Sequence, residues 1–186
     1  LKKQPITSRA MFLKALMAGP WWVGYALGFA LLVKEKFPNN MGAFSLVMGT
    51  YGAGNLLSAL IFGSFHRKHP ERQLYLGFFV LAAGFLMVGS APSLFWIAFG
   101  SFIAAMSGPL NDIPFVDMIQ SHYSFHDLPK LFRLRLALET GSALIGFIAA
   151  PLLFRVFQIN HVIFAVGIWF SIIGLYGLMN IEKKKT

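Results

Sequence analysis

The sequence contains no cysteine, which excludes disulfide bonds and thiolate metal sites. Charge is scarce as well: 12% of the 186 residues are charged, against about 25% in a typical soluble domain. A water-soluble fold needs a surface of mixed charges, so this composition excludes an ordinary soluble domain. The five histidines show no metal-binding spacing such as HExxH, and we expect neither a metal nor a cofactor.

The chain is instead rich in apolar residues, which make up 56% of it, and in aromatic residues, which make up 16%. A membrane-spanning helix needs about 20 mostly apolar residues. Continuous apolar runs argue against a transmembrane β-barrel, whose strands alternate. We therefore expect an all-α membrane protein in one six-helix bundle, with the lipid bilayer as a partner. The expected helices cover residues 10–33, 42–63, 74–91, 93–116, 136–157 and 162–181.

Basic residues predict the orientation of these helices. The net charge of +9 would suit a nucleic-acid partner, but the cations lie in short loops rather than on one stripe, so we expect no nucleic acid. All but three of the 16 Lys and Arg residues fall on one side of the predicted bundle; the exceptions are Lys34, Lys36 and Arg155. The positive-inside rule then places both termini in the cytoplasm. We expect a bacterial inner (plasma) membrane protein and, since the chain starts with Leu, a piece of a longer one.

The predicted helices differ in character. Those over 42–63 and 136–157 carry several small residues, which allow close packing between spanning helices, so we expect them to be internal. Those over 74–91 and 162–181 are almost wholly apolar, and we expect them to face lipid. Gly19-Pro20 and Gly108-Pro109 each interrupt the first helix of a group of three. They indicate hinges in two inverted three-helix repeats, or else two unrelated kinks.

Carboxylates within spanning helices are costly and often functional. Asp112 shares a helix face with Gly108 and should look into the bundle, with Asn111 as a polar neighbour. We interpret Asp112, and Asp117 after it, as candidates for a proton or substrate pathway. The alternative is a helix-end carboxylate that pairs with Arg133 or Arg135.

Other polar and aromatic residues extend this candidate pathway. Glu139 either stabilises a helix N-terminus or couples protons. Asn55 lies mid-helix near Tyr51, where an amide needs a partner helix or a ligand. Trp21, Trp22 and Tyr25 follow the Gly-Pro interruption and form either a cavity wall or a membrane-interface belt. We expect four histidines to be solvated loop residues: His66, His69, His122 and His126.

At this point the sequence resembles the C-terminal six-helix half of the major facilitator superfamily. The loop Gly63–Arg72 is similar to the family's Gly-x-x-x-Asp-Arg-x-x-x-Arg loop, with Arg67 and Lys68 in place of Asp and Arg. The segment 144–152, with Gly146 and Pro151, is similar to the family's helix 11. The region from Gly-Pro to the next helix looks like that of drug and siderophore exporters, and carries Gly108, Pro109, Asn111, Gln120, Pro129, Arg133 and Arg135.

This resemblance implies a twelve-helix transporter that works by alternating access between two bundles. We therefore expect this half to help transport a small amphipathic substrate, by proton-coupled efflux. Its partner would be an N-terminal six-helix half or a second half-bundle. Two alternatives remain: a non-transporting six-helix assembly subunit, and a membrane enzyme. The enzyme would use Asp112, Asp117, His122 or Asp127 at the cytoplasmic face.

Overall fold

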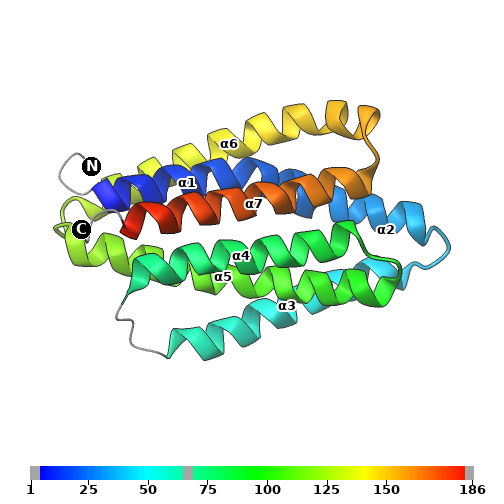
Figure 1. Ribbon diagram of the computed structural model, residues 1–186, viewed down its shortest axis with the longest axis horizontal. Coiled ribbons are helices and arrows are strands. Elements are labelled where there is room, and N and C mark those ends of the chain that lie inside the picture. Colours follow the sequence, from blue (N-terminus) through cyan, green and yellow to red (C-terminus); the bar gives the residue numbers. More distant parts are fainter. Residues whose placement is uncertain (1–4, 65–68, 183–186) are drawn as a thin grey trace.

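The computed structural model describes residues 5–64 and 69–182, and every regular element within them is helical (Figure 1). Six helices are long and apolar enough to cross a membrane, which confirms the predicted all-α membrane class. The first crossing runs without a break through α1 (Pro5–Trp21), η1 (Trp22–Phe29) and α2 (Ala30–Lys36). The others are α3 (Gly42–Gly63), α4 (Pro70–Gly89), α5 (Leu94–His122), α6 (Leu128–Val156) and α7 (Ile159–Glu182).

Several helices extend beyond the apolar runs that predicted them. The first crossing begins at Pro5 rather than residue 10, α5 ends at His122 rather than 116, and α6 begins at Leu128 rather than 136. Helical backbone hydrogen bonding does not require apolar side chains, so these helices continue into segments that carry charged residues. The loop centre at residues 65–68, which includes His66 and the family-like Arg67 and Lys68, lies outside the described residues.

All six crossings lie roughly side by side along the long axis of the bundle (Figure 1). The start of α1, the end of α7 and the α3–α4 and α5–α6 connections share one end. The α2–α3, α4–α5 and α6–α7 connections share the other. This alternation is the one that the distribution of basic residues requires.

Proline alters the first crossing. Pro20 has no N–H to donate to the carbonyl of Leu16, and the helix widens into the π-helical segment η1 immediately afterwards. Pro109 and Pro114 sit inside α5, which remains one continuous α-helix. The two Gly-Pro interruptions therefore have different local structures.

Burial within this chain differs from the expected distribution of internal and lipid-facing helices. Within the apolar window of each helix, 56% of the α4 residues are buried, but only 17% of those in α3 and 11% of those in α6. Two glycines on α4 allow close packing of its neighbours: α5 approaches at Gly84, and α7 approaches at Gly89. Helices α3 and α6 instead make close contact along one stripe each, at Gly54 and Gly146, and turn their remaining surface outward.

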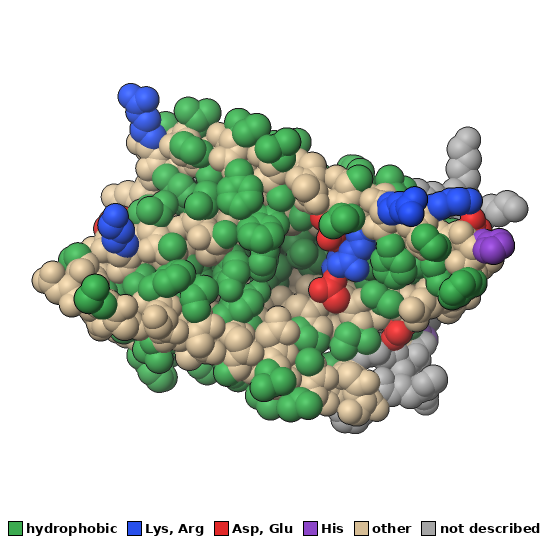
Figure 2. All heavy atoms as spheres, turned by 180° about the vertical axis from the view of Figure 1, so that it is seen from behind, with side chains coloured by type: hydrophobic (Ala, Val, Ile, Leu, Met, Phe, Trp, Pro, Cys, Tyr) green, Lys and Arg blue, Asp and Glu red, His purple; other side chains and the backbone are tan. Residues whose placement is uncertain are grey.

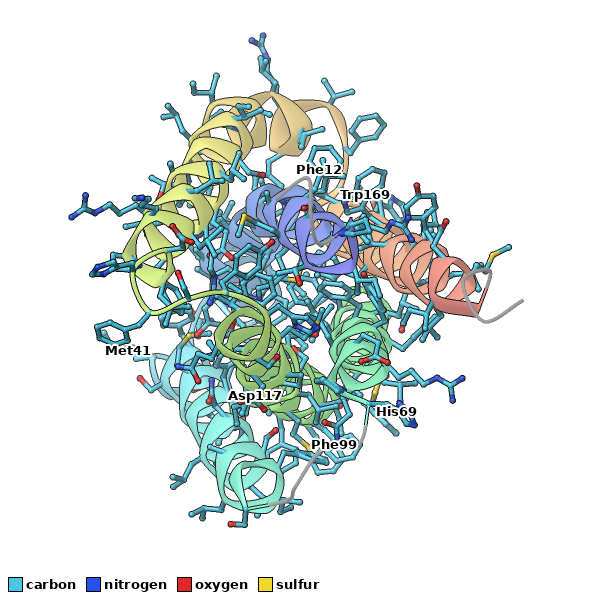
Figure 3. All side chains as sticks on the ribbon, turned by 90° about the vertical axis from the view of Figure 1, so that its left-hand side faces the viewer. Phe12, Met41, His69, Phe99, Asp117 and Trp169 are labelled. Carbon is cyan, nitrogen blue, oxygen red and sulfur yellow. The ribbon has the colours of Figure 1, made fainter. Side chains whose placement is uncertain are left out.

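Seen end-on, α3 and α6 lie apart, with α1 and α5 between them (Figure 3). Helix α1 packs chiefly against α6, and α5 packs against α3 and α4. We call the surface between these two outer helices the α3–α6 face. Figure 2 shows it as hollowed and mainly apolar, with acidic and basic side chains meeting at the edge of the hollow.

Candidate functional site: a charge network and an aromatic cluster

Lys14 is the buried cation of the site. It lies in α1, between the apolar residues Leu13 and Ala15, and only 3% of its side chain is exposed. A cation so placed is unfavourable unless a counter-charge meets it. Its Nζ donates a hydrogen bond to Oδ1 of Asp112 in α5, at 2.7 Å. The pair joins two helices whose backbones make few other contacts.

Asp112 holds two cations at once. The same Oδ1 atom accepts a second hydrogen bond, at 2.6 Å, from Nη2 of Arg135 in α6. About half of the Asp112 side chain, 52%, is exposed on the α3–α6 face. Its carboxylate therefore ties α1 and α6 to α5 and is still accessible from that face.

Arg135 extends the network along α6. Its Nε donates to Oε1 of Glu139, one helical turn further on, at 2.8 Å. The Phe115 ring lies below both cations, with centroid distances of 5.3 Å from Lys14 and 5.0 Å from Arg135. The four ionisable groups, two cations and two carboxylates, sum to no net charge, which lowers the cost of holding them within spanning helices. We call Lys14, Asp112, Arg135 and Glu139 the charge network.

An aromatic cluster lies further along the first crossing. The Trp21 and Tyr25 rings stack with centroids 4.8 Å apart, and Tyr51 of α3 approaches Tyr25 at 4.2 Å. The Tyr25 hydroxyl also reaches the sulfur of Met48, at 3.6 Å. Trp22 turns the other way and packs against Phe147 of α6, at 5.6 Å. These rings join the helices to one another at mid-crossing and do not form a belt at the helix ends.

The network and the cluster follow one another along the first crossing, where Lys14 precedes Trp21 by seven residues, about two helical turns. Asn55, one turn beyond Tyr51, is exposed on α3, and its Nδ2 lies 3.2 Å from the Cβ position of Gly108. The structure thus brings most of the predicted pathway residues to one face.

Two predicted residues lie elsewhere. Asn111 is 3% exposed and packs against Gly77 of α4, so it is not a partner of Asp112. Its Oδ1 is buried without a hydrogen-bond partner in the described residues. Asp117 follows Asp112 by five residues, which rotates it about 140° around α5, and it makes an interaction of its own there. The reason in both cases is helical periodicity.

Two members of the network were not singled out as site residues from the sequence. Lys14 was interpreted only as a flanking cation that sets orientation. Arg135 was named as a partner of Asp112 in the alternative of a helix-end pair, and the structure contains that pair. The sequence did contain a signal for Lys14. This residue lies inside an apolar stretch, whereas a cation that only sets orientation lies at the end of a helix.

The predicted hinge glycines are contact points between helices. Gly19 packs against Ser142 and Gly146 of α6, and Gly108 packs against Asn55 of α3. Of the histidines, His69 lies beside Glu71, His122 bonds the carbonyl oxygen of Met118, and His126 is exposed. Across residues 5–64 and 69–182, no three His, Cys, Asp or Glu side chains gather as a metal site would require.

Comparison with known proteins adds no relative to this description: the chain matches no protein-family model, no curated protein and no solved structure.

Proposed function

We propose that this chain is one six-helix half of a secondary transporter, which moves a small amphipathic molecule across the membrane by alternating access. The observation that carries the proposal is the charge network at the edge of the hollowed α3–α6 face. Ionisable groups inside spanning helices are rare, and they mark ion, proton or substrate pathways. A network that only closed a helix end would have no need of a buried lysine such as Lys14.

The pairing of helices supports a repeat of three helices. In chain order, the first crossing, α3 and α4 form one group of three, and α5, α6 and α7 form the other. Helix α1, in the first crossing, packs against α6, and α5 packs against α3. Each pair thus joins the first helix of one group to the second helix of the other. Two three-helix groups related by a pseudo-two-fold axis would produce this pattern, which is the arrangement expected for half of a major facilitator fold.

A proton at Asp112 provides a coupling mechanism. Protonation would remove the charge that holds both Lys14 and Arg135, so α1 and α6 would lose their shared contact with α5. Proton binding and helix packing are therefore linked, which is the requirement for a proton-driven rocking motion. The aromatic cluster beside the network offers flat apolar surfaces with a polar tip, suited to an amphipathic or aromatic substrate.

A second six-helix bundle would cover the α3–α6 face. This face exposes charged and aromatic groups, including Asp112 and Trp22, which are poorly suited to lipid contact. The bundle would be an N-terminal half of the same protein or a second half-bundle, and substrate would pass between the two.

The test is transport by the full protein in inverted membrane vesicles, with fluorescent amphipathic compounds as probes. We expect a pH gradient to drive their uptake into the vesicles, which corresponds to efflux from the cell. Asp112→Asn should abolish gradient-driven uptake but leave exchange of substrate at equal concentrations. Asp117→Asn is the matched control and should retain both. Gradient-driven uptake by Asp112→Asn at the normal rate would refute the role of this carboxylate.

A further inference from the structure

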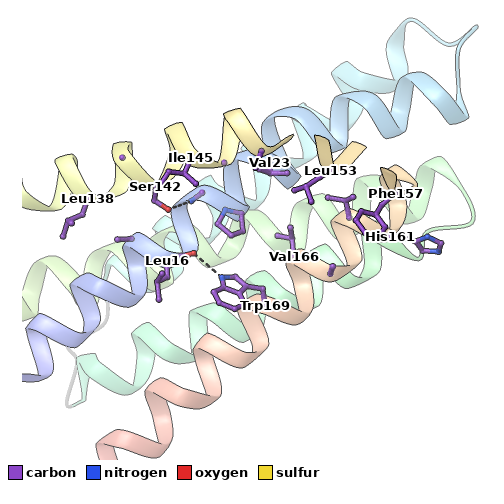
Figure 4. Close-up of a pocket in the computed structure, with 18 of the residues that line it drawn as sticks. Leu16, Val23, Leu138, Ser142, Ile145, Leu153, Phe157, His161, Val166 and Trp169 are labelled. Atoms are coloured by element: carbon purple, nitrogen blue, oxygen red, sulfur yellow. Dashed lines mark hydrogen bonds between the residues drawn. The ribbon is translucent and has the colours of Figure 1, made fainter. Parts of the chain in front are cut away.

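A groove runs along the bundle on the other side of α6 from the α3–α6 face (Figure 4). Its walls are α6 and α7, which separate after their short connection, and its floor is α1. The groove has a volume of about 970 Å³. Small residues create this space on all three helices: Gly19 on α1, Gly141 and Ala149 on α6, and Ala165 on α7.

The groove is lined almost wholly by apolar side chains, and the polar groups along its middle are already paired. The indole Nε1 of Trp169 donates to the carbonyl oxygen of Leu16, at 3.2 Å. The backbone N–H of Gly19 donates to Oγ of Ser142, at 3.0 Å. An occupant of this region therefore needs no hydrogen-bonding groups.

One end of the groove differs from the rest. His161, on the first turn of α7, lines the groove beside Phe157 and is exposed (Figure 4). A ring N–H suits a phosphate, and His161 lies at the end of the bundle, where a lipid headgroup would meet the water interface.

We propose that this groove binds one acyl chain of a membrane phospholipid, with the phosphate of its headgroup at the His161 end. The groove opens sideways between two spanning helices, so its mouth faces the hydrocarbon of the bilayer. From Ala137 to Phe157 its α6 wall is about 30 Å long, which suits an extended chain rather than a compact ligand. The site lies outside the α3–α6 face, so the inference stands whether or not the chain transports.

The test uses the fluorescence of Trp169, whose ring lines the groove. Trp21, Trp22 and Trp96 are changed to phenylalanine in the full protein, which leaves Trp169 as the sole tryptophan of this chain. Phospholipid with brominated acyl chains, which quench tryptophan on contact, is titrated into the protein in detergent. Because detergent replaces the annular lipid, only lipid held by the protein remains beside Trp169. We expect quenching that saturates near equimolar lipid.

Two glycine variants supply the matched comparison. Gly141 lines the groove, and a Cβ there meets no atom within 4 Å, so Gly141→Phe should fill the groove without disturbing the fold. Gly52, on α3, has an equally open Cβ position and lies outside the groove, so Gly52→Phe is the control. Phospholipid retained through purification is counted in parallel by native mass spectrometry, because the ring introduced by Gly141→Phe could itself shield Trp169 from the quencher.

We expect Gly141→Phe to lose both the saturable quenching and the retained phospholipid, and Gly52→Phe to keep both. His161→Phe should weaken lipid binding, because it removes a ring N–H that can donate a hydrogen bond to the phosphate. The proposal is overturned if quenching rises without saturation, or if Gly141→Phe retains as much lipid as Gly52→Phe. It is equally overturned if the groove is closed by a second copy of the chain, seen as a stable dimer that brominated lipid does not quench.

Discussion

Trp169 donates its indole hydrogen bond to the backbone carbonyl of Leu16, and this is the carbonyl that Pro20 leaves without a helical donor. In an α-helix, the N–H of residue 20 would bond to the oxygen of residue 16, and proline has no N–H. A side chain from α7 therefore satisfies a polar group that the first crossing exposes. The indole of Trp169 thus replaces the donor that Pro20 lacks, although the two residues are 149 positions apart in the sequence.

This relationship predicts that the effects of substituting Trp169 and Pro20 on the free energy of unfolding are not additive. Trp169→Phe removes the donor and should destabilise the bundle by about 0.6–1.7 kcal/mol, the range for hydrogen bonds between membrane helices. Pro20→Ala supplies the missing N–H, so the loss from Trp169→Phe should shrink in that background. Unfolding of the single and double variants by SDS in mixed micelles measures the interaction energy. Equal losses in both backgrounds would show that the hydrogen bond is not what Trp169 contributes.

The charge network predicts an order of effects on stability. Asp112→Asn leaves the buried Lys14 without its counter-charge and should cost about 3 kcal/mol, the lower end for a broken buried pair because Asp112 is half exposed. Glu139→Gln breaks only a pair within α6 and should cost about 0.5 kcal/mol. Changing Lys14 to Met in the Asp112→Asn protein should recover part of the loss. The same SDS titration compares these variants, and a larger loss for Glu139→Gln than for Asp112→Asn would contradict the assignment.

Close packing of α3 on α5 should depend on Gly54. A Cβ at this position meets the backbone carbonyl of Phe102, which cannot move aside as a side chain could. Gly54→Leu should therefore separate the two helices and lower the melting temperature in detergent. Gly52→Leu, two residues away and facing open space, should leave the melting temperature unchanged. If the two leucine variants melt alike, the packing of α3 described above is wrong.

The interactions of Asp127, which precedes α6, should make the stability of the fold depend on pH. A hydrogen bond from Ser124, at 3.0 Å, and the nearby Lys130 lower the pKa of this carboxyl below its usual value. The folded state therefore favours the charged form. Its contribution is complete above the pKa of the unfolded chain, about 3.9, and is lost as pH falls through the lower folded pKa.

Asp127→Asn should accordingly be less stable than the parent protein at pH 6, and the difference should shrink as the pH is lowered below 4. Melting temperatures of both proteins across this range provide the measurement. A difference that stays constant with pH would mean that the Asp127 charge adds nothing to stability.

The sequence was sufficient to predict the membrane class and the six crossings, because apolar runs of bilayer length have few other solutions in lipid. It also placed Asp112, Tyr51, Asn55 and the Trp21–Tyr25 segment among the site candidates. Trp21, Tyr25 and Tyr51 form one aromatic cluster, and Asp112 and Asn55 are both exposed. Whether they carry transport stays a prediction.

The burial of each helix and the partners of its polar residues could not be predicted, because they depend on which neighbour each helix face meets. Gly54 and Gly146 are sites of close packing, as the small residues of α3 and α6 predicted, but Gly52 and Gly141 face open space, and one stripe of contact does not bury a helix. Asn111 turned away from Asp112 because adjacent positions on a helix point about 100° apart. Lys14 was assigned to orientation alone, since nothing in one sequence says that residues 14, 112 and 135 are close in space.

The central claim is that the chain crosses the membrane six times, so that its connections alternate between the two sides. Because the sequence has no cysteine, single introduced cysteines report their side of the membrane without background. Phe125, Met41 and Gln158 are exposed in three different connections and can each be changed to cysteine. We predict that a membrane-impermeant maleimide labels Phe125→Cys from one side only, and Met41→Cys and Gln158→Cys from the opposite side only. Labelling of Phe125→Cys and Gln158→Cys from the same side would contradict the account.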